Sequence, residues 1–179
     1  EKMMRSVSNN YQEEAFILKA DFANFFVSID KTILQDILFR TIQSEWDQWM
    51  CDKILWTDVK EGALVKSSRA TLSMVPAHKS LFRAAPNRGL PIGNLTSHFF
   101  ANIYLNEVDQ FAKHLLKARY YGRYVDDIVM MDASGKVLHE KMQEIDNFAN
   151  TQLGIRLHPA KTSINKIDYG VNFVGYIIK

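Results

Sequence analysis

The sequence lacks the features that hold small secreted proteins or membrane proteins together. Its 179 residues include a single cysteine, Cys51, which excludes an internal disulfide framework and a multi-cysteine zinc site. Eight glycines and four prolines are too few for a collagen-like or linker-like chain. No apolar run approaches the roughly 20 residues of a membrane-spanning helix, and no signal-peptide pattern opens the chain. We therefore predict a soluble, cytoplasmic protein with no membrane partner.

The chain also has little net excess of either charge, but its charged residues are unevenly distributed along the sequence. The net charge is only +2, whereas residues 60–88 carry six basic residues against one acidic residue. This segment therefore has a local charge of +5, and the remainder of the chain carries −3. Such a segment either binds phosphates or is simply a solvated loop, and charge alone favours neither. We predict nucleic-acid backbone contacts for Arg69, Arg83 and Arg88, and for Arg123 in a second basic cluster.

Apolar residues make up 47% of the chain, which is enough for a hydrophobic core. Their spacing predicts a strand at 15–22, helices at 30–42 and near 46–55, a long helix at 94–117, strands at 119–124 and 128–131, a helix at 134–153, and strands at about 162–167 and 171–178. Within the long helix, Asp109 and Lys113 have the spacing of an ion pair. The order of elements predicts an α+β, ferredoxin-like fold, with an antiparallel sheet and helices packed on one face.

Three carboxylates fall at informative places in this topology. Asp21 ends the first predicted strand, and Asp126 and Asp127 occupy the turn between two others. Because the first strand and this hairpin lie side by side at the centre of the sheet, we expect all three carboxylates at one edge. Packed carboxylates repel one another unless cations lie between them, and magnesium prefers such oxygen ligands. An Asp-Asp turn by itself is more often structural, because Asp side chains bond nearby backbone amides.

The surrounding residues resemble the motifs of reverse transcriptases. Five segments match in the family's order: Lys19–Phe26, Gly89–Ser97, Tyr124–Asp127, His158–Thr162 and Phe173–Tyr176. The third is similar to the family's Tyr-x-Asp-Asp hairpin. The resemblance covers nearly the whole chain and implies a polymerase palm over residues 1–179, with part of the fingers at about 43–90. The N-terminal fingers and C-terminal thumb of the family have no counterpart in these residues, so we expect the isolated fragment to be inactive.

The resemblance implies the chemistry of an RNA-directed DNA polymerase, a nucleotidyltransferase that works with two metal ions. Asp21 and Asp126 are expected to coordinate both Mg²⁺ ions, for which Mn²⁺ can substitute, and Asp127 is expected to be an auxiliary ligand. The backbone carbonyl of Phe22 is expected to add a further ligand. Lys161 matches a lysine that protonates or neutralises the departing pyrophosphate. The implied partners are an RNA template, a DNA or RNA primer, deoxynucleoside triphosphates (dNTPs) and an accessory protein.

Residues that meet the incoming nucleotide are also implied by the resemblance. The amides around Asn24 and Phe25 are expected to contact the triphosphate. Phe26 stands at the steric-gate position, where a bulky ring excludes a ribose 2′-hydroxyl, although a core position beside Phe25 is the alternative. Ile92 and Gly93 are expected beside the nascent base pair, and an apolar residue in place of the family's usual Gln suggests lower fidelity at this site.

The Ile-Gly-x-x-x-Ser form of this segment resembles the enzymes of bacterial diversity-generating retroelements. His98, where that group usually has Gln, departs from the pattern. Retron and group II intron-like reverse transcriptases are the nearest alternative, with the same chemistry in another genetic element. An alternative of a different class is a non-catalytic nucleic-acid-binding module on the same fold, which would present aromatic residues rather than carboxylates on its central strands.

Overall fold

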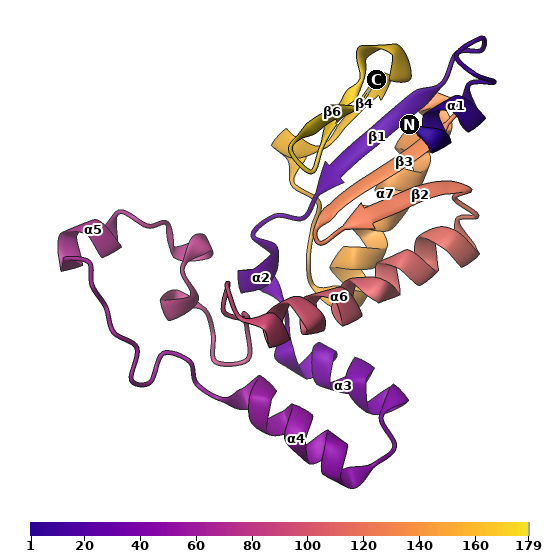
Figure 1. Cartoon of the computed structure of the whole chain (residues 1–179). Coiled ribbons are helices and arrows are strands. Elements are labelled where there is room, and N and C mark those ends of the chain that lie inside the picture. Colours follow the sequence, from indigo (N-terminus) through magenta and orange to yellow (C-terminus); the bar gives the residue numbers. More distant parts are fainter. Residues whose placement is uncertain (179) are drawn as a thin grey trace. The chain divides into compact units, whose positions relative to one another are not determined.

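The computed structural model describes residues 1–178, and at Arg69 it describes the backbone alone. The chain forms two compact units (Figure 1). The first unit, here called the sheet unit, consists of Glu1–Ala23 and Leu105–Lys179, and the second, here called the helical unit, is Asn24–Tyr104. Within the described residues, no helix is long and apolar enough to cross a membrane.

The sheet unit is built around an antiparallel sheet with the strand order β2-β3-β1-β4. Its strands are β1 (Phe16–Asp21), β2 (Tyr120–Tyr124), β3 (Asp127–Asp132) and β4 (Ser163–Lys166). Residues of β1 and β3 lie directly opposite one another, from Phe16 and Asp132 at one end to Asp21 and Asp127 at the other. The sheet and its order confirm the predicted α+β palm fold, with the first strand and the hairpin adjacent at its centre.

Helix α7 (Gly135–Leu153) packs along β1 and β3 on one face of the sheet (Figure 1). The Ser134 side chain caps its first turn by accepting a hydrogen bond from the Val137 amide, and Gly154 ends it in the left-handed conformation with φ of 63°. The buried side chains of the helix recur at helical spacing: Leu138, Ile145, Ala149 and Leu153. This face of the sheet is therefore closed by an apolar layer.

The opposite face of the sheet is covered at one end only. Helix α1 (Lys2–Val7) contributes the fully buried Met4 to a cluster with Ile17 of β1 and Met131 of β3. Ile167 and Val171 complete this cluster from the C-terminal part of the chain. Side chains alternate along a strand, so Lys19 and Asp21 lie on the same face as Ile17 but further along it. The covered end is thus the end away from Asp21.

The predicted C-terminal strand at 171–178 is wrong in form, because the segment folds back on itself. A 3-10 turn at Ile167–Tyr169 leads into β5 (Val171–Phe173) and β6 (Tyr176–Ile178), which pair with each other in a sheet of their own. Val174 and Gly175 between them have φ angles of 54° and 80°. Glycine adopts such angles without steric cost, so Gly175 favours a turn where the apolar pattern favours continuity.

The helical unit contains most of the shorter helices. They are α2 (Phe25–Ser28), α3 (Lys31–Thr41), α4 (Glu45–Trp56), α5 (Arg69–Ser73), and 3-10 turns at Ala77–Lys79 and Leu81–Arg83. The Asp30 carboxylate caps α3 by accepting from the amides of Thr32 and Ile33. The long helix α6 (Leu95–Gln110) begins in this unit and continues into the sheet unit, where a π-helical turn at Phe111–Leu115 ends the predicted 94–117 helix.

Candidate active site

Two of the predicted carboxylates face each other at the open end of the sheet. Asp21 is the last residue of β1 and Asp127 is the first of β3, and the two are direct cross-strand partners. Opposed residues of an antiparallel pair project from the same face, so both side chains lie on the face away from α7. Asp126 lies in the turn that joins β2 to β3. The structure therefore brings together the three carboxylates that the sequence predicts at this edge.

Two lysines lie against these carboxylates. Lys161 Nζ is 3.0 Å from Asp21 Oδ2, and Lys19 Nζ is 3.6 Å from Asp127 Oδ1. The hydrogen bond that Lys161 donates to Asp21 is the main cause that raises the pKa of the Lys161 ammonium. Burial raises the pKa of the Asp126 carboxyl, and the nearby charges of Asp21 and Asp127 add to the effect. The edge is thus a mixed cluster of opposite charges.

The position of Lys161 depends on a short backbone pairing beside β1. The His158 amide donates to the Asp21 carbonyl at 2.7 Å, and the Ala23 amide donates to the Arg156 carbonyl at 2.9 Å. These bonds frame a bridge between Phe22 and Leu157. A 3-10 turn over Pro159–Lys161 then follows directly. Because the segment is tied to β1 at Asp21, the lysine three residues beyond His158 reaches the same carboxylate.

The same pairing orients the carbonyl of Phe22, which is a predicted metal ligand. Successive carbonyls of a strand point to opposite edges, and the Asp21 carbonyl is bonded on the β4 side. The Phe22 carbonyl is therefore directed to the β3 side, where the turn with Asp126 lies. The Phe22 side chain is 1% exposed and belongs to the core. The strand geometry therefore turns this carbonyl toward the turn, and its role as a metal ligand stays a prediction.

The residues at this edge fit a hard divalent cation by chemistry. Carboxylate and carbonyl oxygens are the ligands that Mg²⁺ prefers. Within residues 1–178, no three His, Cys, Asp or Glu side chains are grouped closely enough to hold an ion. In this structure Asp21 and Asp127 are paired with the ammonium groups of Lys161 and Lys19.

The turn that carries Asp126 has an unusual backbone. Tyr124 and Asp127 are paired, so Val125 and Asp126 form a two-residue hairpin loop. Val125 has a φ of 53°, in the left-handed region that glycine normally occupies at this position of a hairpin. For a β-branched residue this conformation is a genuine outlier, with a cost on the order of 1–3 kcal/mol. Other contacts must therefore hold the turn.

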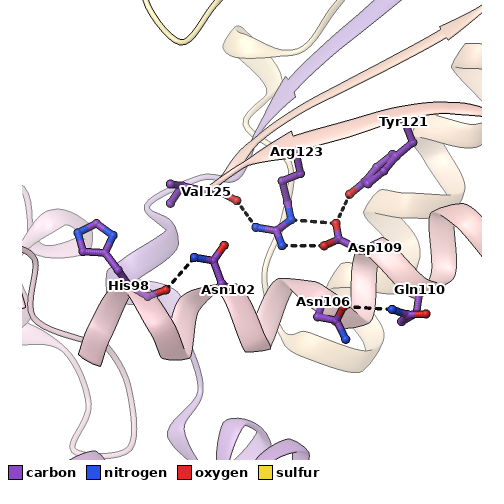
Figure 2. Close-up of polar contacts among 8 residues, drawn as sticks. All are labelled: His98, Asn102, Asn106, Asp109, Gln110, Tyr121, Arg123 and Val125. Atoms are coloured by element: carbon purple, nitrogen blue, oxygen red, sulfur yellow. Dashed lines mark hydrogen bonds and ion pairs between the residues drawn. The ribbon is translucent and has the colours of Figure 1, made fainter. Parts of the chain in front are cut away.

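Arg123 supplies such contacts, as Figure 2 shows. Its Nη1 donates to the Val125 carbonyl at 2.7 Å, while Nε and Nη2 donate to the two oxygens of Asp109 at 2.8 and 2.7 Å. The Tyr121 hydroxyl donates to the same carboxylate at 2.6 Å. The Arg123 side chain is only 9% exposed. This arrangement does not favour the predicted contact of Arg123 with nucleic-acid phosphates, because its guanidinium is engaged inside the protein.

Sequence reasoning missed the partners of this arginine. The spacing of Asp109 and Lys113 predicts an ion pair between them. In the structure Asp109 pairs with Arg123 instead, and the Lys113 ammonium lies 5.7 Å from the centre of the Tyr121 ring. A contact across 14 residues leaves no periodic signal in a sequence. Lys19 was also given no role, although its position two residues before Asp21 puts it on the same face of β1.

The predicted nucleotide-binding residues lie in the helical unit, and their surroundings within it are clear. Asn24 has a left-handed backbone with φ of 49° and precedes α2, and Phe25 is buried. Phe26 makes edge contacts with the rings of Phe25 and His98, at centroid distances of 5.4 and 5.3 Å. The Phe26 carbonyl accepts a hydrogen bond from the Leu90 amide at 2.8 Å. Phe26 is therefore joined by its backbone to the segment that continues to Ile92.

The loop at Ile92 and Gly93 is open. Ile92 is 76% exposed. Gly93 has a φ of 94°, and a Cβ built there would meet no described atom within 4 Å. The backbone conformation, and not a lack of space, is therefore what favours glycine at this position.

The predicted basic contacts in the helical unit differ in their surroundings. Arg83 is exposed. Arg88 Nη1 donates to the Ser28 carbonyl at 2.9 Å, and its Nη2 is 3.5 Å from the Asp30 carboxylate, so this side chain supports the start of α3. The side chain of Arg69 lies outside the described part of the structure. Of the two side chains that the structure describes, Arg83 has the setting that better suits a phosphate contact.

The fold and the carboxylate edge together define a polymerase palm. The profile of the family described as reverse transcriptase (RNA-dependent DNA polymerase) matches residues 2–178, so this chain belongs to that family. A comparison with curated proteins gives no significant match.

Among solved structures, the chain is similar to two telomerases. Apo telomerase from Candida tropicalis is 15% identical, with a TM-score of 0.61 over 99% of this chain and 33% of its own. Telomerase from Candida albicans, in complex with the TWJ fragment of telomeric RNA, is 15% identical, with a TM-score of 0.52 over 92% of this chain and 29% of its own. At this identity the likeness concerns the fold. The chain spans about a third of the length of these telomerase chains.

Proposed function

We propose that this chain is the palm of an RNA-directed DNA polymerase, which transfers deoxynucleotides to a primer 3′-hydroxyl. The observation that carries the proposal is the opposition of Asp21 and Asp127 across β1 and β3, with Asp126 in the adjoining turn. Three acidic residues at one sheet edge repel one another unless cations lie beside them, and divalent ions bound by carboxylate oxygens meet that need. Membership of the reverse transcriptase family supports the same reaction.

Asp21 and Asp126 are proposed to hold two Mg²⁺ ions, or Mn²⁺ in their place, with Asp127 and the Phe22 carbonyl as further oxygen ligands. When bound, such ions activate the attacking oxygen and stabilise the leaving one. Lys161 carries a proton on Nζ at neutral pH, as lysines ordinarily do, and its contact with Asp21 raises the pKa of that ammonium further. It is proposed to give this proton to the departing pyrophosphate as a general acid.

The nucleotide is proposed to meet residues of the helical unit. The amides around Asn24 and Phe25 would contact the triphosphate, and the Phe26 ring would exclude a ribose 2′-hydroxyl. Ile92 is proposed to lie beside the nascent base pair and to lower fidelity, because an alkyl side chain cannot replace the hydrogen bonds of an amide. The exposure of Ile92 in the present structure supports a surface that a substrate covers.

We further propose that the enzyme copies an RNA template in a bacterial diversity-generating retroelement, with an accessory protein. The support is the Ile-Gly-x-x-x-Ser form of the segment at Ile92, whereas His98 departs from the Gln that this group usually has. Retron and group II intron-like enzymes remain the alternative. Residues 1–179 are proposed as the palm with a finger-side segment at about 43–90, so activity is expected of the longer protein and not of this fragment alone.

The proposal is tested by primer extension with the full-length protein. On an RNA template with a DNA or RNA primer, Mg²⁺ and dNTPs, we expect extension that follows the template sequence. Omission of the divalent ion should abolish it, and ribonucleoside triphosphates should be poor substrates. RNA binding that is independent of the metal, without any templated incorporation, would instead support the non-catalytic binding module.

A further inference from the structure

The strained turn at Val125 needs an external support, and the structure shows one. Val125 has a positive φ. Its carbonyl belongs to the peptide bond that joins Val125 to Asp126. The Arg123 guanidinium donates to this carbonyl from two residues upstream. A hydrogen bond to a charged donor is stronger than one between neutral groups, so it can hold a backbone conformation that Val adopts reluctantly.

The arginine is itself fixed by a carboxylate that comes from another element. Asp109 of α6 engages two nitrogens of the guanidinium in a forked geometry, and Tyr121 of β2 donates to the same carboxylate. The Asp109 and Arg123 side chains are 15% and 9% exposed. A forked pair with little solvent access fixes both the position and the plane of the guanidinium. Figure 2 shows Arg123 between Val125 of the turn and Asp109, with the Tyr121 hydroxyl on the same Asp109 carboxylate.

These contacts lie on the side of the sheet away from the carboxylates. Arg123 is the cross-strand partner of Ile128, and Tyr121 is the partner of Met130. Residues 128 and 130 alternate with Asp127, so the two side chains project from the helix-covered face. Asp21 and Asp127 project from the other face. The arginine therefore supports the turn from behind and does not face a substrate at the carboxylate edge.

We propose that Asp109, Arg123 and Tyr121 form a brace that fixes the Val125 turn and thereby positions Asp126 and Asp127 for catalysis. The three are positioning residues, because they act through the backbone of the turn. This inference rests on the proposed polymerase function. It assigns Arg123 a role in the rate of nucleotide transfer and none in the binding of nucleic acid.

Steady-state and single-turnover primer extension by the full-length protein tests the brace. We expect Arg123→Gln to lower kcat by about tenfold or more, with the KM for dNTP and the Kd for primer–template changed by less than about threefold, since a small misplacement of catalytic groups is costly to rate. Arg123→Lys keeps the charge but not the fork and should lose nearly as much. A lowered affinity for primer–template with an unchanged kcat would overturn the proposal.

Lys141→Gln is the matched control. Lys141 pairs with Asp132 at 3.2 Å, at the end of β3 that is remote from the turn, and both side chains are largely buried. We expect this variant to keep kcat within about twofold. An equal loss of kcat in the control would mean that any buried ion pair of the sheet has the same effect, which would refute a specific role for the brace.

A glycine at the turn provides a sharper test. Glycine adopts a positive φ freely, so in a Val125→Gly background the turn needs less support. We expect Arg123→Gln to lower kcat by about threefold or less in that background, against about tenfold or more with Val125. The same loss in both backgrounds would show that Arg123 does not act through the conformation of residue 125.

Hydrogen exchange gives a readout that does not depend on polymerase activity. In the full-length protein, Arg123→Gln should speed exchange at the amides of residues 125–128 and leave those of β4 and α7 unchanged. If the wild-type protein proves inactive on every template, the proposed function fails but this measurement still decides whether the brace exists. If Arg123→Gln does not fold, Asp109→Asn is used in its place. Unchanged exchange at the turn would overturn the proposal.

Discussion

The residues at the open end of the sheet form an electrostatic arrangement in which lysines and carboxylates alternate. Lys19 and Asp21 project from one face of β1, and each group lies near an opposite charge on a neighbouring segment. Such pairs at a partly exposed edge contribute little to folding stability. More important is that the ammonium groups of Lys19 and Lys161 lie where positive charge offsets the charge of the carboxylates. The edge is therefore suited to exchange a lysine for another cation.

Lys161 is the residue for which this arrangement makes a clear prediction. Its ammonium, which is protonated at neutral pH as in lysines ordinarily, hydrogen-bonds Asp21, and this contact raises its pKa further. We expect Lys161→Gln in the full-length polymerase to lower kcat by about 10²-fold, within the usual range for loss of a general acid. Lys166→Gln, which removes an exposed lysine paired with Glu14 just before β1, is the control and should retain full activity. An unchanged kcat in single-turnover primer extension would exclude Lys161 from the chemistry.

Phe26 makes the second prediction at this scale. Its ring packs edge-on against Phe25 and His98, so its orientation is set by neighbours within the helical unit. We expect Phe26→Ala to raise the use of ribonucleotides relative to deoxynucleotides by about tenfold or more, because removal of the ring opens room for a 2′-hydroxyl. The ratio of kcat/KM for the two triphosphates measures this. Phe99→Ala, at a ring that is 61% exposed, is the control. A constant ratio would leave Phe26 as a packing residue only.

At the scale of elements, α7 and the sheet depend on each other. Leu138 is fully buried near the start of α7, which packs on β1 and β3. We expect Leu138→Ala to destabilise the fold by about 2–5 kcal/mol, the usual cost of such a cavity. Leu115→Ala, at a side chain that is 70% exposed, should cost less than about 0.5 kcal/mol. Urea unfolding of the two variants followed by circular dichroism measures the difference. Equal stabilities would contradict the assignment of α7 to the core.

The elements that could be predicted from the sequence are those whose signal is local. The strand at 15–22 and the hairpin at 119–131 have short apolar runs and a turn, and the structure confirms them as β1, β2 and β3. The hairpin at residues 171–178 was missed because an apolar pattern continues across Val174 and Gly175, where only the backbone angles reveal a turn. Local composition cannot distinguish a continuous strand from two short ones in such a run.

The carboxylates of the candidate site could be predicted from the sequence, but the residues that hold them in place could not. Asp21, Asp126 and Asp127 stand next to strand ends, so topology alone brings them together. The contact of Lys161 with Asp21 spans 140 residues and was implied only by resemblance to a family. Neither topology nor family resemblance indicated the brace of Asp109 and Arg123. Its residues are ordinary on a helix and a strand, and only the packing of α6 beside β2 shows their role.

At the scale of the whole molecule, the low net charge and the length of a single domain do not reveal how the charges are distributed along the chain. The acidic edge lies in the sheet unit, and the basic segment at 60–88 lies in the helical unit. The net charge of +2 is the sum of +5 in residues 60–88 and −3 in the rest of the chain, so the basic segment is the source of the positive excess. Such a segment suits contacts with nucleic-acid phosphates.

The central claim is that the carboxylates of the sheet edge carry out metal-dependent nucleotide transfer. The most direct measurement compares Asp126→Asn with Asp168→Asn, an exposed carboxylate of the same unit, in single-nucleotide primer extension by the full-length protein on an RNA template. We expect Asp126→Asn to reduce the rate by at least about 10³-fold at saturating Mg²⁺, and Asp168→Asn to match the wild type. Extension by Asp126→Asn at a rate close to that of Asp168→Asn would contradict the account.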